Sequence, residues 1–366
     1  MGHNLPFIAR QFRTRGEPIE IAPLPVGHIN DTYIVATDRS RYVLQRINQI
    51  VFTKPVEVMA NIVRITGHIR AKMTAAEPEL ALRQLEVIAT QDGGGYYRDA
   101  GDDVWRMYNF IENAVTYDSL QSATLACEAA RMFGWFQRML IDLPGPPLHE
   151  TIPGFHNTPR RFERFQEVLK ADVANRAKNA KGEIDFVFEH AAICHVLYDL
   201  VQRGDIPVRI AHNDAKINNV MFDTKTGKGV CVIDLDTVMP GLSVYDFGDL
   251  VRTATCPAAE DERDLSKVAV DRTLFAALAQ GFVEEAGQFL TPAEKSHLLF
   301  GGKLITFEQL IRFLTDYLAG DVYYKVHREG HNLDRSRTQM KLVQSIIEHE
   351  QDLDRLVERA FQEAST

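Results

Sequence analysis

Polar side chains suited to metal binding and proton transfer gather in one stretch of the chain, residues 210–252. Asp214 is followed five residues later by Asn219, and an apolar segment further on leads directly into Asp234 and Asp236. Phosphoryl transfer needs a carboxylate for the attacking hydroxyl, together with amide and carboxylate oxygens that hold Mg²⁺ on the nucleotide phosphates. The spacing therefore predicts phosphoryl transfer with ATP and Mg²⁺.

Two strands joined by a tight turn must position these residues. The segment 220–233 reads V-M-F, then D-T-K-T-G-K-G, then V-C-V-I, which is typical of a strand, a turn and a partner strand. Such a hairpin returns the chain to where it left, so we expect Asp234 to lie beside Asn219 and Asp214. A plain hairpin with turn-forming Asp and Asn residues would explain any one of these residues, but not all of them at these offsets.

The set His212, Asp214, Asn219 and Asp234 resembles the catalytic and metal-binding motifs of the aminoglycoside phosphotransferase and choline kinase superfamily, a relative of the protein kinases. The resemblance implies Asp214 as catalytic base, Asn219 and Asp234 as magnesium ligands, and His212 as a brace for the loop. Asp236 occupies the position where many of these enzymes carry a second acidic residue, which makes it a further candidate metal ligand.

Two other polar residues of the stretch have alternative interpretations. Lys216 is a candidate to steady the transferring phosphate, or it is a solvated loop lysine. Asp246 begins the tripeptide D-F-G, which the protein kinases also carry, but it lies 27 positions after Asn219 and Asp234 only 15. Because the longer distance does not fit a single hairpin return, we expect Asp246 to be structural, capping or anchoring a helix that begins near Leu250.

The fold implied by the resemblance is α+β and protein-kinase-like. It has a small N-terminal antiparallel-sheet lobe, residues 1–112, which binds the nucleotide, and a larger, mostly helical C-terminal lobe, residues 113–366, for catalysis and substrate binding. The pattern of apolar residues predicts a five-stranded sheet with one helix in the first lobe. The expected elements are three strands within 19–47, a helix at 55–72, and two strands at 85–89 and 105–110.

The turn between the first two strands is the candidate phosphate-binding loop. A tight turn offers backbone N–H groups that point the same way and can hold phosphate oxygens, although an ordinary hairpin would look much the same. The segment G-H-I-N-x-T-Y is similar to the phosphate loop of small-molecule kinases. The resemblance implies nucleotide contacts from Gly27, His28, Ile29, Asn30 and Thr32, and from Tyr108 and Phe110 where the chain crosses between the lobes.

The third strand should supply the cation that holds the nucleotide phosphates, but it contains no lysine. Gln45 and Arg46 point to opposite faces of this strand, and it stays open which of them faces the phosphates. The choline kinases have V-L-x-R-I here, which favours Arg46, a fork-shaped donor suited to phosphate. Glu57 is the candidate partner of this cation, or else an exposed first-turn glutamate favoured by the helix dipole.

The segment 312–339 contains more Arg, Asp and Tyr than packing needs. Its R-F-L-T-D-Y-L-x-G-D-x-Y and H-N-L-D-R-x-R-T-Q motifs look like those of the N-acetylhexosamine 1-kinases, which phosphorylate the anomeric hydroxyl of N-acetylglucosamine or N-acetylgalactosamine. The resemblance implies Arg312, Asp316 and Tyr323 as substrate contacts. The structural alternative is a cluster of ion pairs at a helix end.

Other acceptors fit the same reaction class. An aminoglycoside, choline, ethanolamine or homoserine kinase is the alternative, but a cationic acceptor asks for a site without arginine, and Arg312 argues against it. A catalytically silent kinase-like binding protein is a remote alternative that only the missing strand lysine supports.

Composition restricts the partners. The chain has 366 residues and a net charge of −9, with 50 acidic and 41 basic residues and no dense basic run. This argues against a nucleic-acid-binding protein or a polybasic membrane anchor. The four cysteines lack C-x-x-C spacing, and neither a signal-peptide core nor a run of about 18 apolar residues is present. We expect a cytoplasmic enzyme whose partner is a small molecule such as a sugar; the oligomeric state stays open.

Overall fold

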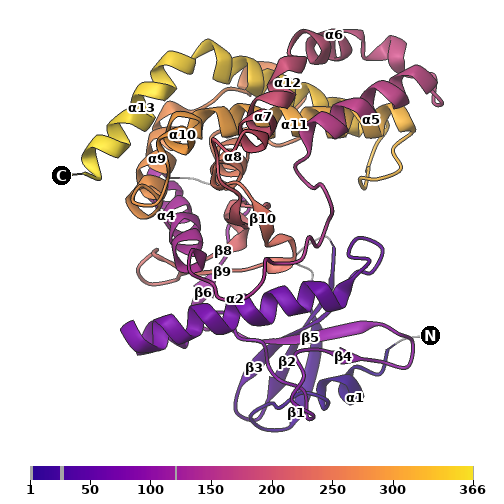
Figure 1. Cartoon of the computed structure of the whole chain (residues 1–366). Helices are drawn as coiled ribbons and strands as arrows, with labels where there is room; N and C mark the ends of the chain where they lie inside the picture. The colour runs from indigo at the N-terminus through magenta and orange to yellow at the C-terminus, as the bar shows by residue number, and fades with distance from the viewer. Residues whose placement is uncertain (1–2, 25–28, 120–121, 366) are drawn as a thin grey trace. The chain divides into compact units, whose positions relative to one another are not determined.

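The computed structural model describes residues 3–24, 29–119 and 122–365. The chain divides into two compact units, which we call the sheet unit and the helical unit (Figure 1). The sheet unit contains Met1–Val115, Met139–Pro153 and Met221–Pro240, and the helical unit contains Thr116–Arg138, Gly154–Val220 and Gly241–Thr366. The first segment of the sheet unit ends at Val115, and the predicted boundary lies at residue 112. Two segments from later in the chain also belong to the sheet unit.

The sheet unit is built on a five-stranded antiparallel sheet in the order β1-β2-β3-β5-β4. Its strands are β1 (Pro18–Pro23), β2 (Asp31–Thr37), β3 (Arg41–Arg46), β4 (Tyr97–Arg98) and β5 (Val104–Asn109). The register places Thr32 opposite Gln45, and Gln45 opposite Arg106, so one row of side chains crosses three strands. The three strands expected within residues 19–47 are confirmed.

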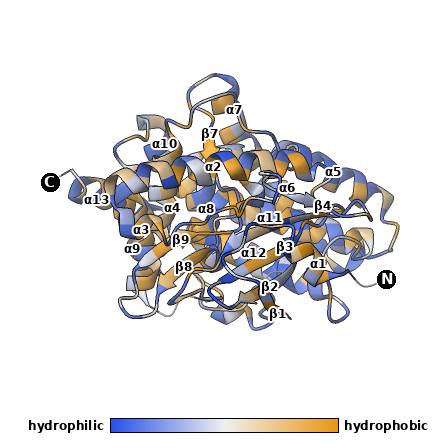
Figure 2. Cartoon of the chain, turned by 90° about the horizontal axis from the view of Figure 1, so that it is seen from below, coloured by the Kyte–Doolittle hydropathy of each residue, from blue (hydrophilic) through white to orange (hydrophobic). Residues whose placement is uncertain are grey.

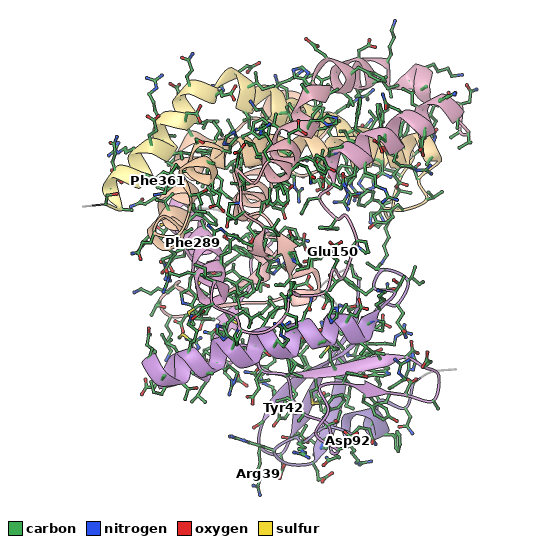
Figure 3. All side chains as sticks on the ribbon, viewed as in Figure 1. Arg39, Tyr42, Asp92, Glu150, Phe289 and Phe361 are labelled. Atoms are coloured by element: carbon green, nitrogen blue, oxygen red, sulfur yellow. The ribbon has the colours of Figure 1, made fainter. Side chains whose placement is uncertain are left out.

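Three helices belong to the sheet unit: α1 (Leu5–Ala9), α2 (Pro55–Ala76) and α3 (Pro78–Ala81). The predicted helix at 55–72 is confirmed as α2, which Figure 1 shows running alongside the sheet. Residues of α1 pack on the sheet in an apolar core that includes Phe12, Leu44, Trp105 and Met107. Tyr42, labelled in Figure 3, lies in this core, and its hydroxyl accepts the Arg15 N–H at 2.7 Å.

The prediction of a strand at 85–89 is wrong. This segment makes only an isolated bridge between Val87 and Tyr108, and the fifth strand of the sheet is β4. The Asn109 side chain explains the difference, because it accepts the Glu86 N–H at 2.7 Å and donates to the Gln84 carbonyl at 3.0 Å. Side-chain hydrogen bonds thus replace part of a backbone ladder.

The predicted hairpin at 220–233 is confirmed as β8 (Val220–Asp223) and β9 (Gly229–Val232). Together with β6 (Ala114–Val115) it forms a three-stranded sheet in the order β6-β8-β9. The Asp223 carboxylate accepts N–H groups of Lys225 and Thr226 within the turn, as expected of an Asp turn. The chain then continues through the 3₁₀ turn η4 (Leu235–Thr237) and the short strand β10 (Met239–Gly241).

The remaining elements are almost all helical, and most of them bury apolar residues. Figure 2 shows hydrophilic and hydrophobic residues sharing the same helices, as amphipathic helices require. The elements are α4 (Ala123–Leu140), α5 (Thr158–Ala171), η1 (Ala177–Asn179), α6 (Lys181–Glu189), η2 (Ala191–His195), α7 (Val196–Gln202), β7 (Arg209–Ala211), η3 (Ile217–Asn219), α8 (Ser243–Ala254), η5 (Leu265–Lys267), α9 (Arg272–Ala286), α10 (Pro292–Ser296), α11 (Leu298–Ala319), α12 (His331–Glu348) and α13 (Glu350–Glu363).

One helix boundary differs from the sequence prediction. The helix expected to begin near Leu250 begins at Ser243, so Asp246 lies inside its first turns.

Helix α6 ends at Glu189, where the His190 ring stacks on Phe186 and its Nδ1 lies 3.0 Å from the Phe186 carbonyl. This side-chain contact competes with the backbone hydrogen bonds that would continue the helix.

Helices α8 and α11 approach each other at glycines, and this contact generates a stability prediction. A Cβ at Gly301 would overlap the Val244 carbonyl oxygen, which is backbone and cannot turn away. We expect Gly301→Ala to lower the free energy of unfolding by about 1–3 kcal/mol or more. The matched control is Gly67→Ala on α2, where nothing lies within 4 Å and alanine should stabilise the helix by about 0.5–1 kcal/mol. Chemical denaturation of both variants measures the difference, and a Gly301→Ala protein as stable as the control would contradict the close contact.

Candidate active site

The loop that follows β7 is held in place by a buried carboxylate of α8. The Asp246 side chain accepts the backbone N–H groups of His212 and Asn213 at 2.9 and 2.8 Å, and the Gln137 amide at 2.6 Å. Asp246 is fully buried, and burial raises the pKa of this carboxyl above its ordinary value. The loop is therefore fixed through its own backbone, immediately before Asp214.

His212 and Asn213 complete this anchor. The His212 ring is buried, with the rings of Phe133 and Phe136 against it at 5.2 and 5.9 Å. Asn213 has φ +63°, a left-handed conformation that asparagine tolerates better than most residues. Gly241 leaves room for it, because a Cβ there would overlap the Asn213 side-chain oxygen. Packing and backbone conformation together give this turn one shape.

Asp214, Lys216 and Asn219 form one polar group on this loop. Lys216 Nζ lies 2.9 Å from Asp214 Oδ2, and Asn219 Nδ2 donates to the Asp214 carbonyl at 2.8 Å and to Oδ2 at 3.3 Å. Burial by itself would raise the pKa of Asp214, but the Lys216 ammonium, with smaller contributions from His212 and Arg252, lowers it below the ordinary value. Asp214 is thus an ionised carboxylate at neutral pH, able to accept a proton.

A buried acid on α11 reaches the same loop through a histidine. His156 lies 2.9 Å from Glu308 through Nδ1 and 3.0 Å from the Asn213 carbonyl through Nε2, so its imidazolium form donates to both. Thr158 Oγ1 also donates to Glu308, at 2.6 Å, and Arg161 lies 3.4 Å away. Sequence reasoning missed Glu308, and its one signal was an acid inside an otherwise apolar helical stripe.

Of the predicted substrate residues, Arg312 is partly buried between aromatic rings. Its guanidinium lies 5.4 Å from the Phe155 ring centre and 5.8 Å from that of Tyr324, and it donates to Gln309 at 3.2 Å. Burial alone would lower the pKa of Arg312, but Tyr324 and Glu308 raise it, so the group stays charged.

Asp316 and Tyr323 have different surroundings. The Asp316 carboxylate is buried and accepts the backbone N–H groups of residues 322, 323 and 324 at 2.8–2.9 Å, as well as the Asn332 amide. It therefore holds the loop that follows α11. Tyr323 lies on that loop, with 66% of its surface exposed.

In the sheet unit, Asp234 and Asp236 face different environments. Asp234 is exposed and has left-handed backbone angles, φ +60° and ψ +58°. Asp236 is 1% exposed and forms an ion pair with both terminal nitrogens of Arg106, while Asn30 Nδ2 donates to it at 2.7 Å. Sequence reasoning missed Arg106; the available signal was a charged residue in the middle of the apolar strand V-W-R-M-Y-N.

The two candidates on β3 lie on opposite sides of the strand. Gln45 accepts the Arg106 Nε–H at 3.0 Å and donates to Thr32 Oγ1 at 3.1 Å. Arg46 pairs with Asp31 at 2.8 Å and with Asp103 at 3.2 Å. The side chain that adjoins the buried Arg106–Asp236 pair is therefore that of Gln45.

The other predicted nucleotide residues are placed as follows. Glu57 pairs with Lys54 at 3.1 Å near the start of α2. Tyr108 is buried, which raises the pKa of its hydroxyl, and Phe110 lies under the Arg41 guanidinium at 4.1 Å. The Ile29 carbonyl accepts from Asn48 at 3.1 Å. Gly27 and His28 lie outside the described residues.

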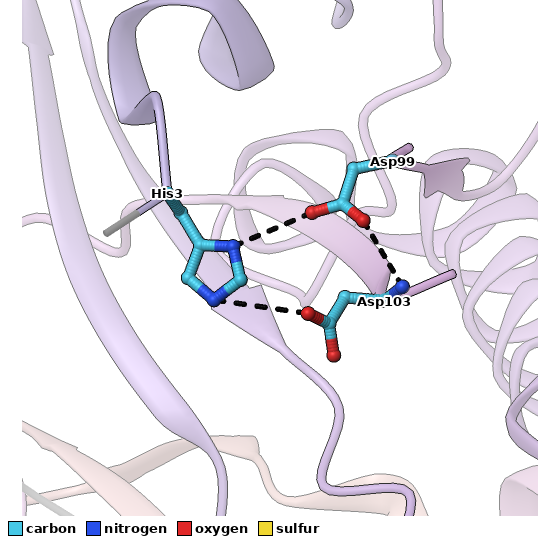
Figure 4. Close-up of side chains that lie close together, drawn as sticks. All are labelled: His3, Asp99 and Asp103. Carbon is cyan, nitrogen blue, oxygen red and sulfur yellow. Dashed lines mark hydrogen bonds and ion pairs between the residues drawn. The ribbon is translucent and has the colours of Figure 1, made fainter. Parts of the chain in front are cut away.

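A third group of possible metal ligands, His3, Asp99 and Asp103, lies in the sheet unit (Figure 4). His3 is 3.4 Å from Asp99 and 3.7 Å from Asp103. Asp99 also accepts the Trp105 indole N–H, and Asp103 already pairs with Arg46. Because cationic and N–H groups occupy both carboxylates, this cluster is an ion-pair network that ties the first residues to the sheet.

Comparison with known proteins decides the family. The phosphotransferase enzyme family matches the chain over residues 20–284. The chain belongs to this phosphotransferase enzyme family. It is therefore an enzyme and, by class, a small-molecule kinase, and the expected membership of the aminoglycoside phosphotransferase family is confirmed.

Solved structures show that this phosphotransferase has the expected fold. An ethanolamine kinase from Plasmodium vivax is similar with a TM-score of 0.54 and 12% identity, over 87% of this chain and 82% of that one. A spectinomycin phosphotransferase in complex with ADP and spectinomycin gives 0.53 and 12%, over 92% and 94%. A choline kinase from Cryptosporidium parvum gives 0.52 and 15%, over 93% of both chains. The α+β, protein-kinase-like fold with a sheet lobe and a larger helical lobe is confirmed.

The donor atoms of this phosphotransferase suit a hard cation. Asn219 uses its amide nitrogen toward Asp214, which directs its amide oxygen the other way. Carboxylate and amide oxygens are the protein ligands that Mg²⁺ prefers; Asp214 and Asn219 of the helical unit carry such oxygens, and so does Asp234 of the sheet unit.

Among the described residues, none of the helices is both long and apolar enough to pass through a membrane.

The Glu308 cluster of this phosphotransferase generates a pH prediction. Burial would raise the pKa of Glu308, but His156, Arg161 and Arg312 outweigh it and lower the pKa to about 2 from an ordinary 4.5. A lowered folded-state pKa gives stability that is present above about pH 4.5 and lost as the pH falls towards 2. Glu308→Gln should therefore lower the free energy of unfolding at pH 7 by on the order of 2–4 kcal/mol, and by less at pH 3.

Urea unfolding at both pH values measures this effect. The matched control is Glu167→Gln, which removes an exposed pair with Arg164 and should change stability by about 0.5 kcal/mol or less. An equal loss for Glu308→Gln at pH 7 and pH 3 would show that charge is not the source of its contribution.

Proposed function

We propose that the protein transfers the γ-phosphoryl group of ATP, with Mg²⁺, to the anomeric hydroxyl of an N-acetylhexosamine. The observation that carries the phosphotransfer chemistry is Asp214, an ionised carboxylate beside Lys216 on a loop that Asp246 anchors. Family membership supports the reaction class. The choice of acceptor rests on the sequence motifs around Arg312 and on the charge of their surroundings.

In the proposed reaction Asp214 accepts a hydrogen bond from the acceptor hydroxyl and takes its proton. The bond from that oxygen to the γ-phosphorus forms as the bond from the γ-phosphorus to the bridging oxygen of ADP breaks. Lys216 keeps Asp214 ionised before the reaction and supplies positive charge near the transferring group. Positioning and charge stabilisation carry most of the rate enhancement in this chemistry.

Asn219 and Asp234 would hold Mg²⁺, which supplies charge neutralisation on the nucleotide phosphates when bound. This requires the two residues to meet with Asp214 at one point, as the hairpin at 220–233 predicts. Asp236 is better suited to a supporting role than to a direct ligand, because Arg106 and Asn30 already engage its carboxylate.

The nucleotide is proposed to lie against the turn before β2 and the end of β5. Gly27, His28, Ile29, Asn30 and Thr32 would approach the phosphates, and Tyr108 and Phe110 the adenine, largely through backbone groups. The spectinomycin phosphotransferase of the same fold binds ADP, which supports ATP as the donor. Arg46 remains a candidate for the phosphates only if it leaves Asp31 and Asp103.

The charge around Arg312 favours a neutral acceptor. Arg312 lowers the pKa of Arg161 after burial itself has done so, which places two guanidinium groups near each other. Glu308 is already engaged by His156, Thr158 and Arg161. A choline, ethanolamine or aminoglycoside cation would meet this positive charge, whereas sugar hydroxyls and an acetamido group accept hydrogen bonds from it. Tyr323 offers an exposed ring on the loop that Asp316 holds.

The experiment that tests the proposal is an acceptor panel. The purified protein with MgATP is given N-acetylglucosamine, N-acetylgalactosamine, an aminoglycoside, choline, ethanolamine and homoserine, and ADP release is measured by a coupled assay. We expect turnover with an N-acetylhexosamine and a phosphorus NMR signal coupled to the anomeric proton. Turnover with choline or an aminoglycoside alone would replace the proposed acceptor, and ATP turnover with none of the panel would contradict the sugar assignment.

Replacement of the proposed base gives a second test. Asp214→Asn keeps the shape of the side chain but cannot take a proton at neutral pH, so kcat should fall by about 10²–10⁴-fold. Nucleotide binding, measured by calorimetry, should survive. The matched control is Asp205→Asn, which removes an exposed carboxylate paired with Arg203 and should leave kcat unchanged. Wild-type turnover by Asp214→Asn would exclude Asp214 as the base.

A further inference from the structure

We propose that Arg106 and Asp236 form a positioning pair that holds Asp234, the proposed magnesium ligand, and residues 29–32 at the start of β2 in register. This inference rests on the proposed function, since it gives the pair a purpose in nucleotide binding. Its evidence lies entirely within the sheet unit.

A chain of hydrogen bonds runs through the pair from Thr32 of β2 to Asn30, which lies just before that strand. Thr32 accepts from Gln45 at 3.1 Å, and Gln45 accepts from Arg106 Nε at 3.0 Å. Arg106 then donates to both oxygens of Asp236, with Nη2 at 3.0 Å, and Asp236 accepts from Asn30 at 2.7 Å. Since Asn30 and Thr32 are two residues apart, the chain nearly closes on itself.

The Asn30 end of this series of hydrogen bonds is fixed as well. The Asn30 side-chain oxygen accepts the Asn48 N–H at 2.9 Å, and the Asn48 amide donates to the Ile29 carbonyl at 3.1 Å. Ile29 and Asn30, the described residues of the candidate phosphate-binding turn before β2, are therefore tied to the segment after β3 and, through Asp236, to the segment that carries Asp234. A shift of either segment would break at least one of these bonds.

The sheet register places the cationic side chain of Arg106 beside β3, which contains no lysine. Gln45 stands directly opposite Arg106, and Thr32 directly opposite Gln45, so their side chains share one face of the sheet. Gln45 links the other two residues, because it accepts a hydrogen bond from Arg106 and donates one to Thr32. Arg46, the next residue, points to the other face and pairs with Asp31 and Asp103.

Burial makes the pair a positioning device and not a phosphate contact. The Arg106 side chain is 1% exposed and that of Asp236 is 2% exposed, so neither reaches solvent. The guanidinium donates through Nε to Gln45 and through both terminal nitrogens to Asp236, so all three of its nitrogens are engaged within the sheet unit.

A buried ion pair is a poor source of stability, because removing two charges from water offsets most of their attraction. Two apolar side chains of similar volume would commonly serve stability as well. The directional contacts of this ion pair instead define geometry, because they fix Asp236 only two residues after Asp234. Asp234 is exposed and has a left-handed backbone conformation, which is uncommon for a residue with a side chain. Asn61 of α2 adds a further restraint by donating to the Val238 carbonyl at 3.1 Å.

The test compares ATP affinity with and without Mg²⁺ by calorimetry, which needs no acceptor. The double variant Arg106→Met/Asp236→Asn removes both charges together and keeps an oxygen for Asn30, so that no unpaired charge is buried. We expect the ratio of metal-free to Mg²⁺-loaded dissociation constants to fall by about 10–100-fold, as for other residues that support metal ligands. Metal-free ATP affinity should change far less.

Arg106→Lys is the second variant, and it keeps the charge while losing the two-pronged contact. It should fold and show a smaller fall in the same ratio. The matched control is Arg98→Met on β4, which removes an exposed pair with Asp102 and should leave the ratio unchanged. Thermal unfolding of each variant separates lost stability from lost metal dependence.

The outcomes are distinguishable. If both variants fold and keep the wild-type ratio within about twofold, the pair is only structural and the inference is overturned. If the double variant does not fold, Arg106→Lys decides alone by the same criterion. If the wild-type protein itself binds no MgATP, the proposed function fails, and the inference falls with it for that separate reason.

Discussion

A buried carboxylate requires hydrogen-bond donors. At Asp246 this requirement fixes the loop on which the proposed chemistry depends. The donors are consecutive backbone N–H groups, those of His212 and Asn213, together with the amide of Gln137. Without them a carboxylate at this depth would be strongly disfavoured. Helix α8 and the loop must therefore adopt their final arrangement together, and the place of Asp214 follows from it.

Two other buried carboxylates are also surrounded by several hydrogen-bond donors. Glu308 is surrounded by His156, Thr158 and Arg161, and Asp236 by Arg106 and Asn30. Each is buried and satisfied from several directions, so each joins segments that are distant in the chain. Such groups contribute less to net stability than to the choice of one arrangement among several. Within its own unit, each of the three carboxylates contacts, directly or through one residue, a segment that the sequence motifs assign to the reaction.

Local patterns were readable from the sequence, and non-local pairings were not. The hairpin at 220–233 follows from turn chemistry within a few residues, and it is confirmed. The segment 85–89 has the composition of a strand, but it forms only an isolated bridge with β5, and the Asn109 side chain accepts the Glu86 N–H. Arg106 and Asp236 are 130 residues apart, and no local signature connects them. Candidate residues could be named from motifs, while their partners required coordinates.

The glycine contact between α8 and α11 has a consequence for how acceptor preference can diversify. Gly248 and Gly301 bring the two backbones together with no side chain between them, and α11 carries Arg312 while α8 carries Asp246. Because α11 is packed this closely on α8, a rotation or shift of α11 toward a differently shaped acceptor would also disturb α8 and the loop that carries the proposed base. We therefore expect changes of acceptor preference to arise at the exposed Tyr323, on the loop after α11, and not in the two helices themselves.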